Sequence, residues 1–215
     1  MTLLGIDIGT SGCKITAIDE CGRILDEGFA EYGTSHPQPG WAEEDPEDWC
    51  IAVRGILAGL KERGTVDFAD IAAIALDGST HNAVLLDGEM QVVRPTIMWT
   101  DQRAVAESAE LNDEHGEAVF GTAYQMAAPT WTLPQMLWLQ RHEPEALART
   151  SHVMFVKDYV RYRLTGEWCT DTIEAQGTLF FDMARKQWSP ELCGLAGIPL
   201  DILPPLVSPT DVVGK

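Results

Sequence analysis

Gly5-Ile6-Asp7-Ile8-Gly9-Thr10-Ser11-Gly12-Cys13-Lys14 is the stretch from which the fold can be read. An apolar strand ends in a carboxylate, the chain turns through two glycines and two hydroxyl residues, and a second apolar strand follows a lysine. Gly9 and Gly12 can adopt positive φ, so that successive N–H groups converge on an anionic oxygen, while Thr10 and Ser11 add hydroxyl donors. The stretch predicts a β-hairpin that binds phosphate.

The charged residues of this hairpin refine that prediction. Lys14 supplies a positive charge, and Asp7, which would repel a phosphate directly, makes sense if Mg²⁺ or its water shell lies between them. The glycine spacing matches neither a Walker loop nor a dinucleotide-binding turn. The alternative is a tight hairpin with an ordinary polar turn. We interpret Asp7 as buried, and a buried carboxylate beside a glycine turn is hard to justify on structural grounds alone.

Composition indicates a protein of the α/β class with one large domain or slightly more in 215 residues. The 15 basic and 33 acidic residues give a net charge of −18, which opposes binding to nucleic acid and to anionic membranes. The five cysteines have no metal-ligand spacing and no disulfide framework, and no apolar run approaches the ~20 residues of a membrane span. These features predict a cytoplasmic location.

Periodicity predicts an antiparallel meander of strands at 3–8, 14–19 and 24–32. A helix should follow, with Asp45 as N-cap and Pro46 in its first turn, and should run to about Arg63 before Gly64 stops it.

Later segments predict further strands and helices around a mixed sheet. The continuous apolar run 71–76 predicts a buried strand with parallel neighbours. Two more strands are expected at 82–86 and 94–99, and helices are expected at 101–115, 132–142 and 155–164.

Six segments then carry a resemblance to a known family. They occur in order along the chain between about residues 3 and 182: Asp7-x-Gly9-Thr10-Ser11-Gly12-x-Lys14, Pro39-Gly40-Trp41-x-Glu43-x-Asp45-Pro46-x-x-Trp49, Gly78-Ser79-Thr80-His81, Trp99-x-Asp101-x-Arg103, Leu137-Trp138-Leu139-Gln140-Arg141-His142 and Lys157-Asp158-Tyr159. Together they resemble the N-terminal part of the FGGY carbohydrate kinases, and within that family the xylulokinases. The resemblance implies the ribonuclease H-like α/β fold of the actin, hexokinase and sugar kinase superfamily, a mixed sheet with antiparallel first three strands flanked by helices.

The resemblance also implies roles for the hairpin residues. Thr10, Ser11 and Gly12 match residues that meet the phosphates of ATP, and Lys14 matches a basic residue beside them. Asp7 matches the acid that helps to place Mg²⁺, through water.

On the sugar side, the xylulokinases use a Met-His pair after the fourth strand, where this chain has Thr80 and His81. Thr80 departs from this pattern at a position that contacts the substrate in the xylulokinases, so another substrate of the family is an alternative. Trp99 and Asp101 match a segment that borders the sugar pocket, with Trp99 covering an apolar sugar face and Asp101 accepting from hydroxyl groups. Arg103, in the same segment, more often has a structural role.

Each of these residues also has a purely structural alternative. His81 could be a hydrogen-bonded histidine where a strand meets a loop, Trp99 could fill a core or an edge, and Asp101 could be the N-cap of the next helix. Where the family has a lysine, this chain has Gln135, which we interpret as a packing residue. Lys157 and Asp158 are expected to have structural roles.

Phosphoryl transfer to a sugar hydroxyl also needs a carboxylate that takes the proton. In the family this aspartate and the adenine site lie beyond the stretch that the chain matches, so residues 1–215 are predicted to be an incomplete N-terminal kinase domain, inactive alone. Three hypotheses follow: part of an ATP-dependent ketopentose kinase acting on D-xylulose, part of a kinase for another polyol, ketose or sugar acid, or a non-catalytic sugar-binding module.

Half of a two-domain cleft exposes its cleft face, so a homodimer through that face is expected.

Overall fold

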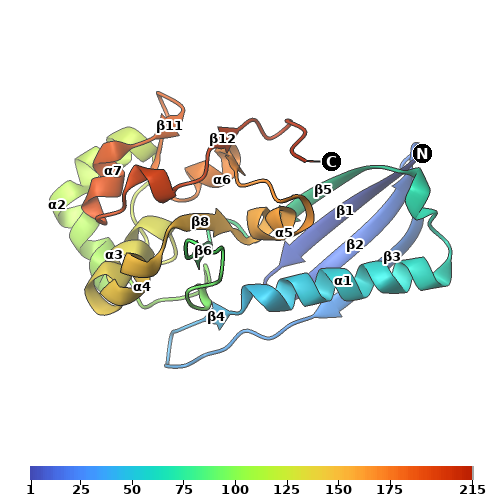
Figure 1. The fold of residues 1–215 in the computed structure, drawn as a ribbon. Helices are drawn as coiled ribbons and strands as arrows, with labels where there is room; N and C mark the ends of the chain where they lie inside the picture. The colour runs from blue at the N-terminus through green and yellow to red at the C-terminus, as the bar shows by residue number, and fades with distance from the viewer. Residues whose placement is uncertain (215) are drawn as a thin grey trace. The chain divides into compact units, whose positions relative to one another are not determined.

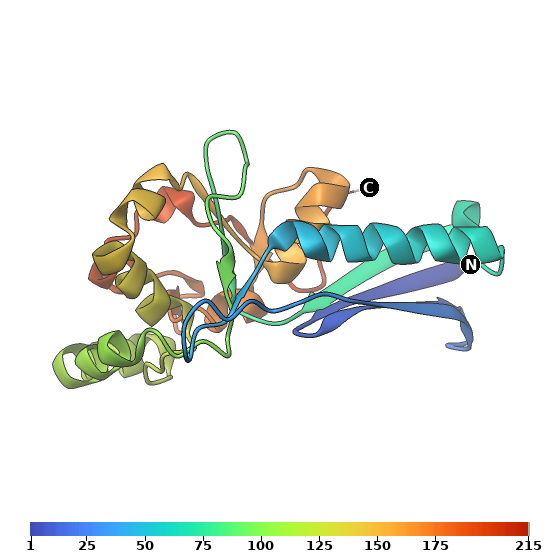
Figure 2. The ribbon, with the colours of Figure 1, turned by 90° about the horizontal axis from the view of Figure 1, so that it is seen from below.

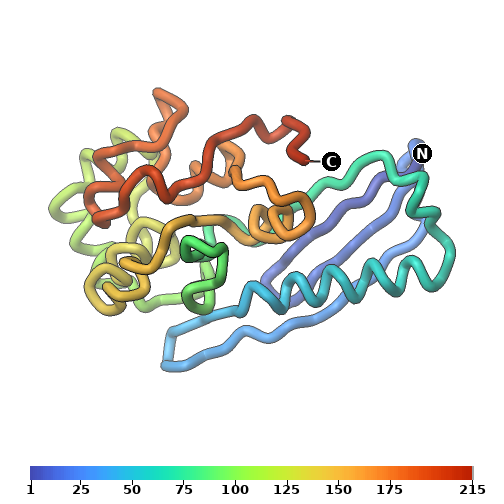
Figure 3. Tube along the Cα trace, viewed as in Figure 1, coloured from blue at the N-terminus to red at the C-terminus, as the bar shows by residue number. Residues whose placement is uncertain are grey.

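The computed structural model describes residues 1–214, and the chain divides into two compact units. The first unit consists of Met1–Thr34 and Asp45–Ser79, and the second of Ser35–Glu44 and the chain from Thr80 onward. The trace in Figure 3 follows the chain out of the first unit after β3 and back into it at the start of α1. Each unit has its own hydrophobic cluster. Lys215, the last residue of the predicted kinase domain, lies outside the described residues.

The first unit is built on a four-stranded mixed sheet in the order β3-β2-β1-β5 (Figure 1). Strands β1 (Thr2–Gly9), β2 (Gly12–Asp19) and β3 (Ile24–Glu31) form an antiparallel meander, and β5 (Ile71–Gly78) pairs parallel to β1. The predicted meander and the parallel fourth strand are confirmed.

One long helix, α1 (Pro46–Arg63), packs against β2 and β3, as Figure 2 shows. Its first turn is capped by the Asp45 carboxylate, which accepts from the N–H of Glu47 at 2.9 Å. Gly64, with φ of 65°, ends the helix in the left-handed conformation that a glycine adopts without strain. The helix and both of its predicted boundaries are confirmed.

Strand β5 differs from its prediction. It follows a short 3₁₀ turn (Phe68–Asp70), and most of its side chains are exposed, with Ile74 46% exposed. The prediction of a buried strand is wrong because β5 is the edge strand of this sheet within residues 1–214, with β1 on one side only. A continuous apolar run indicates a strand that is covered on both faces, but it does not indicate whether a second neighbouring strand is present.

In its described part, up to residue 214, the second unit contains four short two-stranded ladders. Strand β6 (Ala83–Leu86), predicted at 82–86, pairs antiparallel with β8 (His152–Phe155). The others are β4 (Glu43–Glu44) with β7 (Thr96–Ile97), β9 (Thr170–Asp171) with β12 (Leu206–Val207), and β10 (Phe181–Asp182) with β11 (Gln187–Trp188). The strand predicted at 94–99 is thus reduced to two residues.

Helices provide about half of the buried residues in the second unit's main hydrophobic cluster. The predicted helices are confirmed as α3 (Thr132–His142) and α5 (Val156–Thr165), whereas α2 runs over Val105–Ala123 rather than 101–115. Gly116 and Gly121 lie inside α2 without ending it. The remaining helices are α4 (Pro144–Arg149), α6 (Thr172–Gln176), α7 (Pro190–Leu195) and a 3₁₀ turn (Leu200–Ile202). Within residues 1–214 none of the helices has the length and apolar character needed to span a membrane.

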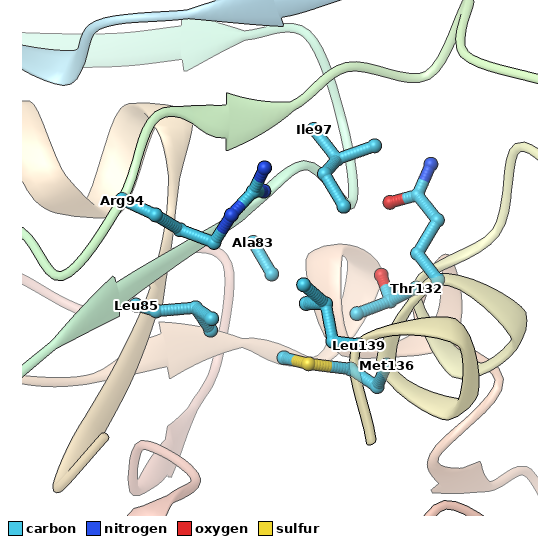
Figure 4. Close-up of a pocket in the computed structure, with 8 residues that line it drawn as sticks. Ala83, Leu85, Arg94, Ile97, Thr132, Met136 and Leu139 are labelled. Carbon is cyan, nitrogen blue, oxygen red and sulfur yellow. The ribbon is translucent and has the colours of Figure 1, made fainter. Parts of the chain in front are cut away.

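A small cavity lies between β6, β7 and α3 in the core of this unit (Figure 4). Its lining is apolar except for Arg94, Thr132 and Gln135, and its volume is about 10 Å³. That volume holds at most one water molecule, so this cavity is not a ligand site.

Candidate functional site

The turn between β1 and β2 is a two-residue turn, Thr10-Ser11, closed by the pair Gly9 and Gly12. Neither glycine has a positive φ, so that part of the prediction is wrong. Gly12 is required for a different reason: a Cβ there would lie 2.7 Å from the Ala30 carbonyl oxygen and 2.7 Å from the Phe29 ring of β3.

The hairpin is also held from the end of β3. The hydroxyl of Tyr32 donates a hydrogen bond to the carbonyl of Gly9. The turn is therefore held on the sheet from two sides, by its own strand pairing and by this hydroxyl.

Asp7 is exposed, so its interpretation as a buried carboxylate is wrong. Side chains alternate along a strand, and Leu4, Ile6 and Ile8 fill the core on the opposite face. Within residues 1–214 the Asp7 carboxylate makes no hydrogen bond and no ion pair. A charged group left free at the end of β1 is available to a ligand.

Two charged residues stand directly beside Asp7 in the strand register. Lys14 is its partner across β2, and Asp77 is its partner across β5. Lys14 makes an ion pair of 3.1 Å with Glu27, in which both side chains are about half exposed. Asp77 was missed from the sequence, although the parallel pairing predicted for strand 71–76 would have placed it at the same edge as Asp7.

These residues border a shallow hollow of about 320 Å³ on the open face of the sheet. Its lining consists of Asp7, Lys14 and Asp77 with Gly5, Ile6, Thr16, Ala75 and Leu76. Two carboxylates beside a lysine and a hydroxyl-bearing turn form a donor set that suits hydrated Mg²⁺ together with phosphate oxygens. The residues present therefore fit the metal that the family resemblance implies.

In the second unit, His81 occupies a tightly fixed corner just after Thr80, which is exposed. Its φ is +52°, an uncommon conformation for a side chain other than glycine. The Glu174 carboxylate accepts a hydrogen bond from the His81 N–H, and the Thr132 hydroxyl donates to the His81 carbonyl at 2.6 Å.

His81 as a residue is 8% exposed, and its imidazole ring contacts the Trp131 ring, with centroids 4.7 Å apart. Burial lowers its pKa to about 4, so the ring is neutral at pH 7. Its Nδ1 has no hydrogen-bond partner within the described residues. The alternative of a hydrogen-bonded histidine where a strand meets a loop thus holds for the main chain of His81, whereas its buried Nδ1 is not hydrogen-bonded within residues 1–214.

Trp99 and Asp101 have contrasting environments. Trp99 is 44% exposed. Asp101 is fully buried, and its two oxygens accept from the N–H of Ala42 at 2.6 Å and from the N–H of Arg103 at 2.7 Å. Its contact with a sugar stays a prediction. The alternative N-cap role is wrong, because α2 begins at Val105 with Ala104 in the cap position.

Arg103 completes a buried polar cluster. Its guanidinium pairs with Asp101 at 2.9 Å and with Glu43 at 2.8 Å, and it lies over the Trp41 ring at 3.8 Å from the centroid. Trp138 lies on the same guanidinium at 5.0 Å. The predicted structural role of Arg103 agrees with this geometry.

The first turn of α3 joins the His81 and Trp99 segments. Thr132 binds the main chain of His81, and Gln135 donates to the carbonyl of Met98 at 3.3 Å. Gln135 therefore does more than fill space in the core, because its side-chain amide binds the main chain of Met98, the residue before Trp99. The structure brings together Asp7, Thr10, Ser11, Gly12 and Lys14 in the first unit, and Thr80, His81, Trp99 and Asp101 through this turn in the second.

A buried ionic cluster lies behind His81. Lys157 contacts Asp158 at 2.9 Å, Asp171 at 2.8 Å and Glu174 at 3.5 Å. Burial raises the pKa of Glu174 to about 7, and Lys157 opposes that rise. Nearby acids raise the pKa of Lys157 above its usual value in spite of burial. Lys157 and Asp158 are therefore structural, as predicted.

The fold and the hairpin agree with a comparison to known proteins. The family model for the N-terminal domain of the FGGY family of carbohydrate kinases matches residues 2–215. The chain belongs to the FGGY family of carbohydrate kinases.

Particular members of that family are also similar. A xylulose kinase of Bacillus subtilis is 36% identical over 99% of this chain. A crystal structure of a xyloylose kinase from Brucella ovis has a TM-score of 0.95, 36% identity, and covers 100% of this chain and 45% of that one. A gluconate kinase from Lactobacillus acidophilus has a TM-score of 0.93 at 26% identity, covering 100% of this chain and 43% of that one. These likenesses confirm the predicted α/β sugar-kinase fold.

The matched relatives are longer proteins. This chain spans 43% of the Bacillus subtilis xylulose kinase. More than half of such a relative therefore has no counterpart among these residues.

Proposed function

We propose that this chain is the N-terminal part of a cytoplasmic, ATP-dependent kinase that converts the ketopentose D-xylulose to D-xylulose 5-phosphate. The observation that carries the proposal is the exposed, uncommitted Asp7 at a hydroxyl-bearing hairpin turn, in a chain that matches the family from residue 2 to 215. All five cysteines are free thiols, which is compatible with a reducing compartment.

In this proposal the hairpin binds the phosphates of ATP. Phosphoryl transfer depends mainly on positioning and on electrostatic stabilisation of the phosphate oxygens. The main chain and hydroxyls of Thr10 and Ser11 would donate to those oxygens, and Asp7 and Asp77 would hold hydrated Mg²⁺. When bound, the metal supplies positive charge to the phosphates. Lys14 can exchange Glu27 for a phosphate at little cost, because an exposed ion pair is worth about 1 kcal/mol or less.

His81 and Trp99 contact the sugar in this proposal. The neutral ring of His81 forms a hydrogen bond through Nδ1, and the exposed indole of Trp99 covers the apolar face of the pentulose. The carboxylate that takes the proton from the attacking hydroxyl is proposed to lie beyond residue 215.

The proposal is tested on the protein that contains this chain together with the remainder of its reading frame. Asp7→Asn is expected to lower kcat on the order of 100-fold or more, with the KM for sugar little changed. Asp48→Asn, which removes an exposed carboxylate of α1 in the same unit, serves as the control and should retain full activity. A fully active Asp7→Asn variant would show that Asp7 has no role in phosphate or metal binding.

A second acceptor class is favoured by one residue. Thr80 stands where the xylulokinases have methionine, and one of the similar structures is a gluconate kinase. A panel of ketoses, polyols and sugar acids decides between the two. If D-xylulose is the poorest acceptor in the panel, the proposed pentulose substrate is wrong, but the proposed kinase activity stands.

A further inference from the structure

The main chain at His81 is held by two side chains from distant parts of the sequence. Glu174, at the buried face of α6, accepts from its N–H, and Thr132, at the start of α3, donates to its carbonyl. These partners lie 93 and 51 positions further along the chain. Both polar groups of one residue are thus fixed from outside its own segment.

The clamp supports a conformation that His81 would not hold alone. A left-handed φ of +52° is unfavourable for an L-residue with a Cβ, and such outliers persist where surrounding contacts over-determine them. A hydrogen bond to a carboxylate is among the stronger ones in proteins, and Lys157 favours the charged form of Glu174 against the effect of burial, so Glu174 can offset this strain.

The ring of His81 is confined as well. It lies against Trp131 on one side, and a Cβ at Gly177 would come within 3.3 Å of the His81 Cβ and Cδ2 on another. Gly177 follows α6 directly, so the same short helix supplies both the carboxylate for the main chain and the space for the ring. With the backbone and the ring fixed, the unpartnered Nδ1 has a defined position.

Glu174 is itself held in place. Its carboxylate is 3.5 Å from Lys157, and Asp171 accepts from the N–H of Ile173 at 2.8 Å and of Glu174 at 3.0 Å, which caps α6. Lys157 also binds Asp171 and Asp158. The lysine therefore both fixes the start of α6 and keeps a positive charge beside Glu174.

We propose that Glu174 is a positioning residue for substrate binding: its carboxylate, placed by Lys157, holds His81 in the left-handed conformation that directs the imidazole to the sugar. This inference rests on the proposed function for the role of the sugar, but the clamp itself does not. Glu174 affects the affinity for the sugar acceptor and leaves ATP binding unchanged.

The test uses the protein that contains this chain with the remainder of its reading frame, and two kinds of variant. Glu174→Leu removes the acceptor, whereas Glu174→Gln keeps an acceptor oxygen and loses the charge. Thr132→Val removes the other half of the clamp with little change in shape, and it carries the test if Glu174→Leu does not fold. Glu167→Leu, at an exposed glutamate between α5 and β9, is the matched control.

Two readouts separate the clamp from the kinase activity. Without any sugar, the amide resonance of His81 in NMR spectra should move markedly in Glu174→Leu and less in Glu174→Gln. In kinase assays the KM for the sugar should rise about tenfold or more in Glu174→Leu and in Thr132→Val, which is the scale of one lost hydrogen bond to a charged or fixed group. The KM for ATP should be unchanged, and kcat should stay within about threefold.

The outcomes are distinguishable. An unmoved His81 resonance in a folded Glu174→Leu variant overturns the clamp. A moved resonance with an unchanged KM for the sugar, or with equal rises in both KM values, overturns the positioning role. A wild-type protein that phosphorylates no sugar refutes the proposed function, and the inference about substrate then falls with it while the resonance still reports on the clamp.

Discussion

Replacing Lys157 with methionine should destabilise the second unit by about 3 kcal/mol, because it leaves buried acids without their cation. The side chain of Lys157 is 12% exposed and contacts three carboxylates between 2.8 and 3.5 Å. Breaking a buried ion pair on one side costs about 3–5 kcal/mol. The lower end applies here, because Asp158 keeps Arg161 at 2.7 Å and Asp171 keeps two amide donors.

Most of this loss should fall on Glu174, whose carboxylate then keeps, within residues 1–214, the hydrogen bond from the N–H of His81. The pKa of Glu174 is raised to about 7, mainly by burial, so its contribution to stability is complete below its ordinary pKa of 4.5 and is lost as pH rises through about 7. Without Lys157 this pKa rises further. The deficit of Lys157→Met should therefore be larger at pH 8 than at pH 5, by about 1.4 kcal/mol for each unit of further rise.

Thermal unfolding followed by near-UV circular dichroism at both pH values measures the effect. A deficit of about 3 kcal/mol lowers the Tm by roughly 6–12 °C in a chain of this length. The control is Lys186→Met, which changes an exposed lysine of the same unit and should stay within about 0.5 kcal/mol. Adding Glu174→Gln to Lys157→Met should recover part of the loss. A Tm equal to that of the control, or a larger deficit at pH 5 than at pH 8, refutes this reasoning.

Three further predictions concern the two candidate sites. Gly12→Ala should lower the free energy of unfolding by about 1–3 kcal/mol in a urea titration, because its Cβ would lie 2.7 Å from the Ala30 carbonyl oxygen. Gly5→Ala is the control: its Cβ would have open space around it, so the free energy of unfolding should be unchanged or slightly higher. Trp99→Ala should leave the Tm almost unchanged and raise the KM for sugar several-fold, and an unchanged KM removes it from the sugar site. The lowered pKa of His81 means that its stabilising effect is complete above pH 6.5 and is lost as pH falls toward 4; an NMR titration midpoint near 4 is expected, and one at 6.5 contradicts the burial argument.

Local signals allowed the first unit to be predicted. The apolar alternation of β1 and β2, the Asp45 cap and the Gly64 stop each depend on residues within a few positions of one another. Asp7 was assigned to the correct strand but to the wrong environment. Alternation with Ile6 and Ile8 would have placed it on the open face.

The contacts that shape the second unit are long-range, and they left no periodic signal. A helix cap is the structural alternative that the sequence offers for Asp101, because the residues after it are helical in composition. Its carboxylate instead binds the N–H of Ala42, 59 positions away, which nothing in the local sequence indicates. Glu174 lies in a five-residue helix, too short for a recognisable period. Its link to His81 could be found only from coordinates.

The insertion of Ser35–Glu44 into the second unit has a consequence for how the protein is made. Ala42 bonds to Asp101 and β4 pairs with β7, so this segment lacks these long-range partners until synthesis has passed residues 96–101, and until then it has only its internal bonds between Ser35 and Glu43. At roughly 5–20 residues per second, the ribosome needs about 3–11 s to travel from residue 44 to residue 101. The strands and helix of the first unit are complete by residue 79. A nascent chain can therefore form its hairpin and sheet before the residues that pair with the ten-residue segment between β3 and α1 have been synthesised. Stalled chains released at about 80 and at about 105 residues should therefore differ in the protease sensitivity of residues 35–44.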